Sequence, residues 1–459
     1  MNRSSPSATF RDPAGSLSFK ENHAVRQIAA AARGPALEFL NSEFCRRAQA
    51  RGDLIPAEIV DVPEGGLCLR HPRIAVPTYP WEWAPGQWLA AAELTLALGS
   101  EALADGWILK DATPLNVLFD GARPVFVDIL SFERRRPESG VWLAYGQYVR
   151  TFLLPLLAHR LLQWPFEVTL FRRDGYEPSD LYAALGWSQR LKPAALWPIT
   201  LPALLGRRNI PHGSARPPRA LPPEVATAVL TRTMKGLLRR TRGAMPEGSA
   251  SQWSDYPANL THYTAEQSVT KAGWVRSQLE SIRPEYVLDV GANTGEFSAL
   301  AAKLGAQVVA LERDQPAADR IFTMAREQTL PVLPIHADLA RPTPAVGWEN
   351  NESLSLLARL EGRFDCVLML AVIHHLILME QVPIRSILAL AYDLTRRSFL
   401  LEWVPPHDPM YQSLMRGRDA LYGSLSEADL EAACAGLFQP VDRHLLGNQR
   451  VLLHLEKIV

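Results

Sequence analysis

One segment constrains the fold of this chain more than any other: Tyr286-Val-Leu-Asp-Val-Gly-Ala-Asn-Thr-Gly-Glu-Phe-Ser298. An apolar run ends at a glycine-rich turn and a helix-forming run follows at once, which predicts a strand, a tight turn and a helix. Gly291 and Gly295 lack a Cβ, so the backbone can bend sharply and a ligand can approach the amides at the start of the helix. Asp289 falls at the carboxyl end of the predicted strand, where open α/β sheets bind ligands.

Two kinds of nucleotide-binding turn have this general form. A dinucleotide fingerprint requires G-x-G-x-x-G, with its glycines facing a pyrophosphate. Here the order is D-x-G-x-N-x-G, with Asn293 in place of the middle glycine. The carboxylate of Asp289 repels a pyrophosphate but suits the cationic end of an amino acid. The pattern resembles the first motif of class I S-adenosylmethionine-dependent methyltransferases, which implies S-adenosyl-L-methionine as cofactor, bound by Asp289, Gly291, Asn293 and Gly295.

Strand-like and helix-like runs alternate through the C-terminal half. The predicted strands are Tyr286–Val290, Gln307–Leu311, Val332–His336, Phe364–Leu370, Ser398–Val404, Phe438–Leu446 and Arg450–Ile458. Alternation favours a parallel sheet flanked by helices, whereas the last two strands are too close in sequence to be anything but antiparallel. We predict an α/β fold with a mostly parallel, Rossmann-like sheet and an antiparallel terminal hairpin, as the resemblance also implies.

Acidic side chains end two further strands of this set. Glu312 follows the glycine turn by roughly 20 residues, the offset at which an acid can accept hydrogen bonds from ribose hydroxyls. The methyltransferase resemblance implies that Asp338 contacts the adenine amino group and that Leu339 offers the ring a backbone amide and an apolar edge. An acid at a strand end is also a common turn former, and that interpretation stays open for each acid alone.

Methyl transfer to a hydroxyl requires a group that removes the hydroxyl proton. His374 and His375 follow the fourth strand, and the ordinary pKa of histidine lies near neutrality. We expect one of them, His375 in the first place, to face the acceptor, while the other packs or caps a helix. Glu402, at the end of the fifth strand, is a further catalytic candidate. The sequence shows no clustered carboxylates for a metal-dependent reaction, so no metal site is predicted there.

The N-terminal half contains a second acid-bearing pattern, within Leu109–Phe119 and Gly121–Asp128. Two short strands joined by a tight turn predict a hairpin that brings Asp111, Asn116 and Asp128 together. The layout resembles the catalytic loop and metal-binding strand of protein-kinase-like phosphotransferases, especially small-molecule kinases. That resemblance implies an α+β kinase-like domain in which Asp111 is the catalytic base and Asn116 and Asp128 hold the magnesium ions of ATP.

This kinase-like pattern departs from the family in several places. Leu109 stands where histidine is usual, Asp128 is followed by Ile-Leu instead of Phe-Gly, and no phosphate-cradling glycine loop precedes. A degenerate lobe that binds or positions a molecule therefore stays open, as does a simple turn in which Asp111 and Asn116 cap the backbone. Upstream, Ala24–Arg33 and Ala36–Arg51 are rich in helix formers and are predicted helices.

The chain divides by composition into three parts. We predict a kinase-like domain over residues 1–190, a proline-rich and basic linker region over 191–255, and a methyltransferase domain over 256–459. An aromatic segment and the helix after it precede the first strand of the last domain. Either they form a lid or acceptor wall over the cofactor or they simply pack under the linker; the residues concerned are Trp253, Tyr256, Tyr263 and Lys271.

Composition narrows the classes of partner. Lys+Arg and Asp+Glu number 48 each, so the net charge gives no reason to expect nucleic acid or an anionic membrane as partner. The four cysteines are far apart in sequence, which favours free thiols in a reducing compartment. The N-terminus has no apolar signal region, and no apolar run reaches the ~20 residues of a membrane span. We expect a cytoplasmic protein.

The sequence therefore predicts a methyltransferase, most simply an O-methyltransferase acting on a small-molecule or glycan-type acceptor that the N-terminal domain orients or recruits. The alternative is a bifunctional or ATP- and Mg-dependent phosphotransferase that uses Asp111, Asn116 and Asp128. A non-catalytic protein that senses the cofactor is a third interpretation.

Overall fold

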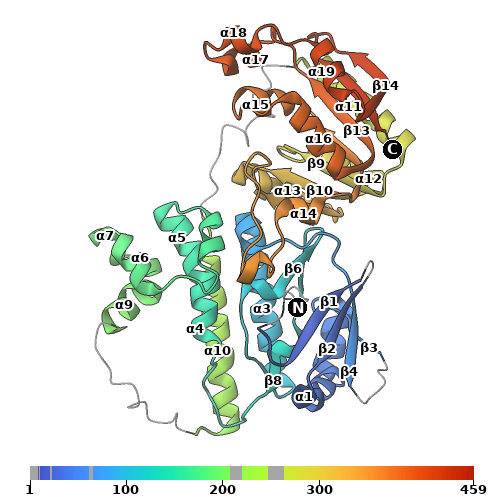
Figure 1. Ribbon diagram of the computed structural model, residues 1–459. Coiled ribbons are helices and arrows are strands. Elements are labelled where there is room, and N and C mark those ends of the chain that lie inside the picture. The colour runs from blue at the N-terminus through green and yellow to red at the C-terminus, as the bar shows by residue number, and fades with distance from the viewer. Residues whose placement is uncertain are drawn as a thin grey trace. The chain divides into compact units, whose positions relative to one another are not determined.

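A computed structural model of the chain describes residues 9, 11–20, 23–60, 66–206, 220–246 and 263–458. The chain forms two compact units, and Figure 1 labels many of their helices and strands. Unit 1 comprises Met1–Gly248 with the short segment Val346–Ser353, and unit 2 comprises Ser249–Ala345 with Leu354–Val459. Both units mix helices and strands, so the predicted α/β character is confirmed at this level.

Unit 2 is built on a seven-stranded sheet with the order β11-β10-β9-β12-β13-β15-β14. Its strands are β9 (Tyr286–Val290), β10 (Gln307–Glu312), β11 (Val332–His336), β12 (Phe364–Met369), β13 (Thr395–Trp403), β14 (Phe438–Leu445) and β15 (Val451–Lys457). The first five run parallel to one another, and β15 pairs antiparallel with both β13 and β14. All seven predicted strands are present, and their bounds differ from the prediction by at most a few residues.

Helices accompany these strands along the chain. They are α11 (Ala265–Ile282), α12 (Glu296–Lys303), α13 (Gln315–Glu327), α14 (Leu356–Leu360), α15 (Ile373–Leu378), α16 (Ile384–Leu394), α17 (Pro409–Met415), α18 (Asp419–Tyr422) and α19 (Glu427–Cys434). In Figure 1, α16 lies beside the sheet, where it contacts β13 and α19. The five parallel strands are mostly buried, with Val287, Leu288 and Val367 fully buried, whereas the edge strand β14 is mostly exposed. Continuous burial is typical of parallel strands covered on both faces.

The strand register gathers the ends of several strands at one edge of this sheet. Asp289 of β9 lies between Ala310 of β10 and Leu368 of β12. Because β15 runs antiparallel to β13, its first residue, Val451, is paired with the last residue of β13, Trp403. The start of β15 is thereby brought to the carboxyl end of β13.

Unit 1 contains an antiparallel four-stranded sheet with the order β1-β2-β4-β3. Its strands are β1 (Gly15–Phe19), β2 (His23–Ile28), β3 (Glu58–Val60) and β4 (Leu67–Pro72). Two helices, α1 (Ala30–Leu40) and α2 (Glu43–Arg51), separate β2 from β3. The prediction of a helix over Ala24–Arg33 is therefore wrong for its first five residues. In β2 the buried residues alternate with more exposed ones, which is the period of a strand.

Two short two-stranded ladders follow a long buried helix, α3 (Pro85–Ala104). β5 (Trp107–Leu109) pairs with β8 (Phe132–Arg134), and the predicted hairpin is present as β6 (Val117–Asp120) with β7 (Arg123–Phe126). The later helices are α4 (Tyr145–Tyr148), α5 (Leu154–Leu162), α6 (Pro178–Ala184), α7 (Trp187–Arg190), α8 (Pro193–Ala195), α9 (Leu201–Gly206) and α10 (Pro223–Arg242). Helical turns thus occupy 193–206, inside the range for which the sequence predicted a linker. None of the helices in the described ranges is long and apolar enough to span a membrane.

Candidate functional site

The glycine-rich turn between β9 and α12 requires its glycines. Gly291 and Gly295 have φ angles of +67° and +86°, in the left-handed region. A Cβ at Gly291 would lie 2.6 Å from Cγ2 of Val372, and one at Gly295 would lie 3.0 Å from Cε of Met324. Both the conformation and the close packing of neighbouring segments therefore exclude larger residues. Asn293, between them, also has a left-handed φ of 51°.

Asp289 is an acid enclosed by unit 2. Its side chain is buried, and its Oδ2 accepts a hydrogen bond of 2.6 Å from Oγ of Ser298, on α12. Burial raises the pKa of Asp289 to about 6, although the Ser298 hydrogen bond and the charge of Lys271 both act to lower it. At neutral pH the group is mostly ionised and is ready to bind a cation.

Glu312 holds the glycine turn against the end of β10. Its Oε2 accepts a hydrogen bond of 2.7 Å from the backbone amide of Asn293, and its Oε1 accepts one of 2.8 Å from the amide of Asp314. Burial raises the pKa of Glu312 despite these two amides. A carboxylate has about four acceptor positions. Those that the amides leave open can serve a ligand.

A cavity of about 350 Å³ lies over this turn, within the ~300–1,000 Å³ range of small-molecule sites. It brings together four of the predicted cofactor residues, from the ends of β9 and β10, and the catalytic candidate His375, which follows β12. Its lining residues are Tyr263, Ser268, Lys271, Asp289, Gly291, Ala292, Asn293, Thr294, Glu296, Phe297, Glu312, Arg313, Leu370, Ala371, Val372, His375 and Met379. The arrangement can hold a polar, partly cationic ligand beside backbone amides.

The two predicted histidines differ in position. His375 lines the cavity, whereas His374 is buried, with its ring 4.2 Å from that of His375. Burial, together with the charges of Arg313 and Arg450, lowers the pKa of His375 to about 4. His375 is therefore neutral at physiological pH, the form that can accept a proton.

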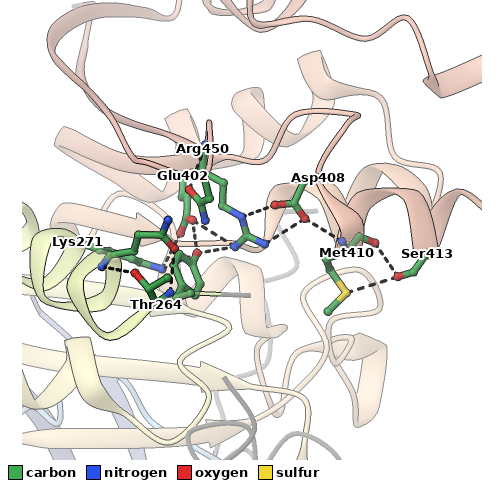
Figure 2. Close-up of polar contacts among 10 residues, drawn as sticks. Thr264, Lys271, Glu402, Asp408, Met410, Ser413 and Arg450 are labelled. Carbon is green, nitrogen blue, oxygen red and sulfur yellow. Dashed lines mark hydrogen bonds and ion pairs between the residues drawn. The ribbon is translucent and has the colours of Figure 1, made fainter. Parts of the chain in front are cut away.

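Glu402 is fully buried in a network of charged side chains, which Figure 2 shows. Its Oε2 accepts a hydrogen bond of 2.6 Å from Nζ of Lys271, and its Oε1 accepts one from the hydroxyl of Tyr263. Arg450 lies 3.5 Å from the same Oε1. Burial alone would raise the pKa of Glu402, but the charges of Lys271 and Arg450 outweigh it, and the pKa lies below its usual value.

Arg450 extends this network to the start of α17. Its Nε and Nη2 donate to the two carboxylate oxygens of Asp408 at 2.8 and 3.2 Å, and its Nη1 donates to the Tyr263 hydroxyl at 2.5 Å. Asp408 in turn caps α17 by accepting from the amide of Met410. Glu402 therefore has partners on every side and is not among the residues that line the cavity, unlike Lys271 and Tyr263.

Asp338 and Leu339, predicted to contact adenine, follow β11. The carboxylate of Asp338 accepts hydrogen bonds from the amide of Ala340 at 2.9 Å and from Arg341 at 3.2 Å, and Leu339 is buried. Neither residue is among those that line the cavity.

Of the predicted lid residues, Tyr263 and Lys271 line the cavity, and Trp253 and Tyr256 lie outside the described residues.

In unit 1 the structure brings Asp111, Asn116 and Asp128 into one cluster. Nδ2 of Asn116 donates to Oγ of Ser131 at 3.0 Å and to the carbonyl of Asp111 at 3.4 Å. Oγ of Ser131 donates to Oδ2 of Asp128 at 2.5 Å. Burial raises the pKa of Asp111. The hairpin predicted from the sequence accounts for this proximity.

Arg26 forms an ion pair with Asp128 of this cluster. Nη1 of Arg26, on β2, donates to Oδ1 of Asp128 at 2.9 Å, and the Arg26 side chain is buried. Both carboxylate oxygens of Asp128 are thus engaged by the protein itself. A magnesium ion needs near-octahedral oxygen ligands and is repelled by a guanidinium at this distance. The residues present do not fit magnesium in this arrangement. Within the described ranges no group of three or more His, Cys, Asp or Glu side chains is arranged to hold a metal ion.

Sequence reasoning missed Arg26 and Arg450, because each is paired with an acid that is distant in the chain. In the sequence, a buried arginine is marked only by a single charged residue within or beside a strand-like run. Arg450, directly before β15, is an example.

No protein-family model matches the chain. Nodulation protein NoeA of Rhizobium meliloti strain 1021 is 29% identical to it over 472 residues, which cover 98% of this chain and 95% of NoeA. The likeness to NoeA therefore extends over both units.

Two solved structures show partial likeness to the chain. The bifunctional kinase-methyltransferase WbdD matches with 18% identity and a TM-score of 0.30, over 42% of this chain and 39% of the WbdD chain. Magnesium protoporphyrin IX methyltransferase (ChlM) from Synechocystis PCC 6803, with bound SAH, matches with 17% identity and a TM-score of 0.31, over 49% of this chain and 95% of that chain. This chain thus spans about two fifths of the WbdD structure that it matches.

Proposed function

We propose that unit 2 binds S-adenosyl-L-methionine in the cavity over the glycine turn and transfers its methyl group to a hydroxyl of a small-molecule or glycan-type acceptor. One observation carries the proposal: Asp289 and Glu312 end neighbouring parallel strands, flank one glycine turn and line one cavity. The D-x-G-x-N-x-G turn resembles that of class I methyltransferases, in which acids in these two positions bind the amino group and the ribose. The strand order of the sheet supports the same assignment.

Each polar residue of the cavity has a distinct task in this proposal. Asp289 accepts from the ammonium group, because it is buried and ionised at neutral pH. Glu312 accepts from the ribose hydroxyls with the lone pairs that its two amide partners leave open. The glycines let the backbone amides come close to the ligand. Asp338 and Leu339 remain proposed neighbours of the adenine.

The bound cofactor supplies a sulfonium methyl group that a nucleophile can displace. The reaction breaks the carbon–sulfur bond and forms a carbon–oxygen bond, and the acceptor hydroxyl must release its proton. His375 lines the cavity and is neutral, so one of its ring nitrogens can take that proton, while burial and the nearby arginines make it a weaker base than an exposed histidine. Glu402, held by Lys271 and Arg450, positions other side chains and does not act as a base.

Unit 1 is proposed to recruit or orient the acceptor. The alternative, ATP- and Mg-dependent phosphotransfer at Asp111, Asn116 and Asp128, has a specific obstacle, since Arg26 and Ser131 occupy both oxygens of Asp128. No observation in unit 1 favours that reaction over a binding role.

The test is transfer of a labelled methyl group from S-adenosyl-L-methionine into extracts of bacterial metabolites and glycans. Wild-type protein is expected to label a hydroxyl-bearing product. His375→Ala should lower the rate by about 100-fold or more, while the matched control His444→Ala, which removes a histidine outside the cavity, leaves it unchanged. If no fraction of any extract is labelled, or if His375→Ala labels at the wild-type rate, the proposed reaction or its proposed base is wrong.

A further inference from the structure

Helix α9 and the single π-helical turn before it, η6 (Leu196–Thr200), leave large apolar side chains exposed on unit 1. Trp197 is 64% exposed and Leu205 is 56% exposed, while Leu204 is exposed and Leu201 is half-buried. Leu201 and Leu204 follow Trp197 by four and seven residues, the spacing that places side chains on one face of a helix. These four residues are called the apolar row below.

The other side of the same helical segment is packed. Ile199 is fully buried and Ala203 is buried. Both η6 and α9 contact α6, which lies beside α9 in Figure 1. Because the buried side makes these contacts, the packing of unit 1 does not require Trp197 or Leu205 to be apolar. Large apolar side chains that gather on an exposed face mark a binding surface.

A hydrogen bond holds the end of α7 against η6. Oγ1 of Thr200 donates to the carbonyl of Arg190 at 2.7 Å. Leu191 and Lys192, which come next in the chain, are exposed beside the turn that carries Trp197. The end of α7 therefore adds one apolar and one cationic side chain to the surface of the apolar row.

The charge of this part of the chain differs from that of the whole. The whole sequence has 48 Lys+Arg and 48 Asp+Glu, whereas the stretch between Asp180 and Glu224 contains no Asp or Glu. The same stretch contains six basic residues: Arg190, Lys192, Arg207, Arg208, Arg216 and Arg219. Each Lys or Arg close to an anionic membrane surface contributes about 1 kcal/mol of attraction. The local charge therefore complements an anionic surface, although the net charge of the chain is zero.

Trp and Leu side chains beside Lys and Arg are the composition of helices that lie in the surface of a membrane. Tryptophan favours the level of the lipid headgroups, and leucine favours the acyl chains below them. A nucleic acid would use the cations but would leave the apolar row in water. The combination of both features points to lipid.

We infer that unit 1 docks on the surface of membranes that contain anionic lipids, through the apolar row and the end of α7. The docked side chains lie in the membrane interface, and no helix spans the bilayer. None of these residues is among those that line the cavity of unit 2, so the inference does not depend on methyl transfer.

Co-sedimentation of the full chain with lipid vesicles tests this docking. One set of vesicles is phosphatidylcholine alone, and the other contains equal parts of phosphatidylcholine and phosphatidylglycerol. Wild-type protein is expected to bind the mixed vesicles at least about tenfold more strongly than the neutral ones, and to lose this preference in high salt. Trp197→Ser/Leu205→Ser should bind the mixed vesicles about 10- to 100-fold more weakly than wild type, because two apolar side chains no longer leave water.

The matched control is Trp348→Ser/Leu421→Ser, which removes the same two residue types at positions that are 58% and 66% exposed. It should bind vesicles as wild type does. Both double variants should keep the wild-type melting temperature, since all four side chains are exposed.

Three results would overturn the inference. Wild type could fail to bind the mixed vesicles, or bind both kinds equally. The variant of the apolar row could bind as tightly as wild type. Finally, sedimentation velocity without lipid could show a wild-type dimer that Trp197→Ser/Leu205→Ser abolishes, in which case a second copy of the chain covers the row.

Discussion

Acidic side chains follow predicted strands in both units, yet they meet different partners. In unit 1, Asp128 lies against the guanidinium of Arg26 and the hydroxyl of Ser131. In unit 2, Asp289 and Glu312 are held by a serine and by backbone amides, and both line a cavity. A carboxylate that accepts hydrogen bonds from neutral donors keeps its net negative charge. A carboxylate that pairs with an arginine forms a pair with no net charge. The partner of an acid, rather than the acid itself, decides whether a cationic ligand can bind.

We expect the largest effect in the buried network beside the cavity, where the loss of a charge lowers the free energy of unfolding. Glu402→Ala leaves Lys271 and Arg450 buried without their shared anion. Breaking a buried pair by removing one partner costs about 3–5 kcal/mol. Denaturant unfolding should show this loss. Glu427→Ala, which removes the acid of a half-exposed pair with Arg443 in the same unit, should cost about 1 kcal/mol or less. Equal losses in the two variants would contradict the assigned role of the network.

Glu312 should matter more to the cofactor than Asp338. Glu312→Gln replaces a charged acceptor on the cavity wall, and we expect S-adenosylhomocysteine to bind about 10- to 100-fold more weakly, which corresponds to about 1.5–3 kcal/mol. Asp338→Asn should cost no more than about 1 kcal/mol, because its carboxylate is bonded to Ala340 and Arg341 outside the lining. Calorimetry of both variants measures the difference. If Asp338→Asn weakens binding more than Glu312→Gln does, the ligand lies nearer to β11 than we propose.

The pH dependence of binding should report Asp289. Its pKa of about 6 means that the ionised form, which attracts the ammonium group, is lost as the pH falls through 6. Affinity for S-adenosylhomocysteine should therefore drop roughly tenfold between pH 7.5 and pH 5, in keeping with one pKa unit of protonation. His375, with a pKa of about 4, stays neutral over this range. Asp289→Asn should bind weakly and with a much flatter profile, since the titrating group is gone. A wild-type profile as flat as that of the variant would exclude Asp289 from the site.

We expect the smallest effect when Mg-ATP is added to test the acidic cluster of unit 1. Because Arg26 already neutralises Asp128, millimolar Mg-ATP should leave the melting temperature of the wild-type protein unchanged, whereas S-adenosylhomocysteine should raise it. Thermal-shift measurements on wild type and Asp128→Ala check this. A Mg-ATP shift that disappears in Asp128→Ala would restore the phosphotransferase alternative.

The sequence predicted the sheet of unit 2 well, because its five parallel strands are largely apolar runs, each followed by a turn or a helix. Asp289 and Glu312 were found for the same reason: their place at a strand end is a local property of the chain. The strand His23–Ile28 was missed because Arg26 interrupts its apolar alternation and its neighbours are good helix formers. The burial of Arg26 depends on Asp128, about a hundred residues away.

The charged network around Glu402 could not be predicted from the sequence for a similar reason. Arg450 meets Glu402 and Asp408 only because β15 runs antiparallel to β13 in one particular register. Lys271 was one of the candidates for a lid or acceptor wall, but the sequence did not indicate that it pairs with Glu402. Local patterns predict elements and the residues at their ends, whereas pairing between distant charges follows from packing that those patterns do not specify.

The most direct test of the central claim is calorimetric binding of S-adenosylhomocysteine to three proteins: wild type, Asp289→Ala and Asp128→Ala. We predict that wild type and Asp128→Ala bind with the same affinity and that Asp289→Ala binds about 10- to 100-fold more weakly. Absence of binding to wild type, or an equal loss in the two variants, would contradict the assignment of the cofactor to the cavity of unit 2.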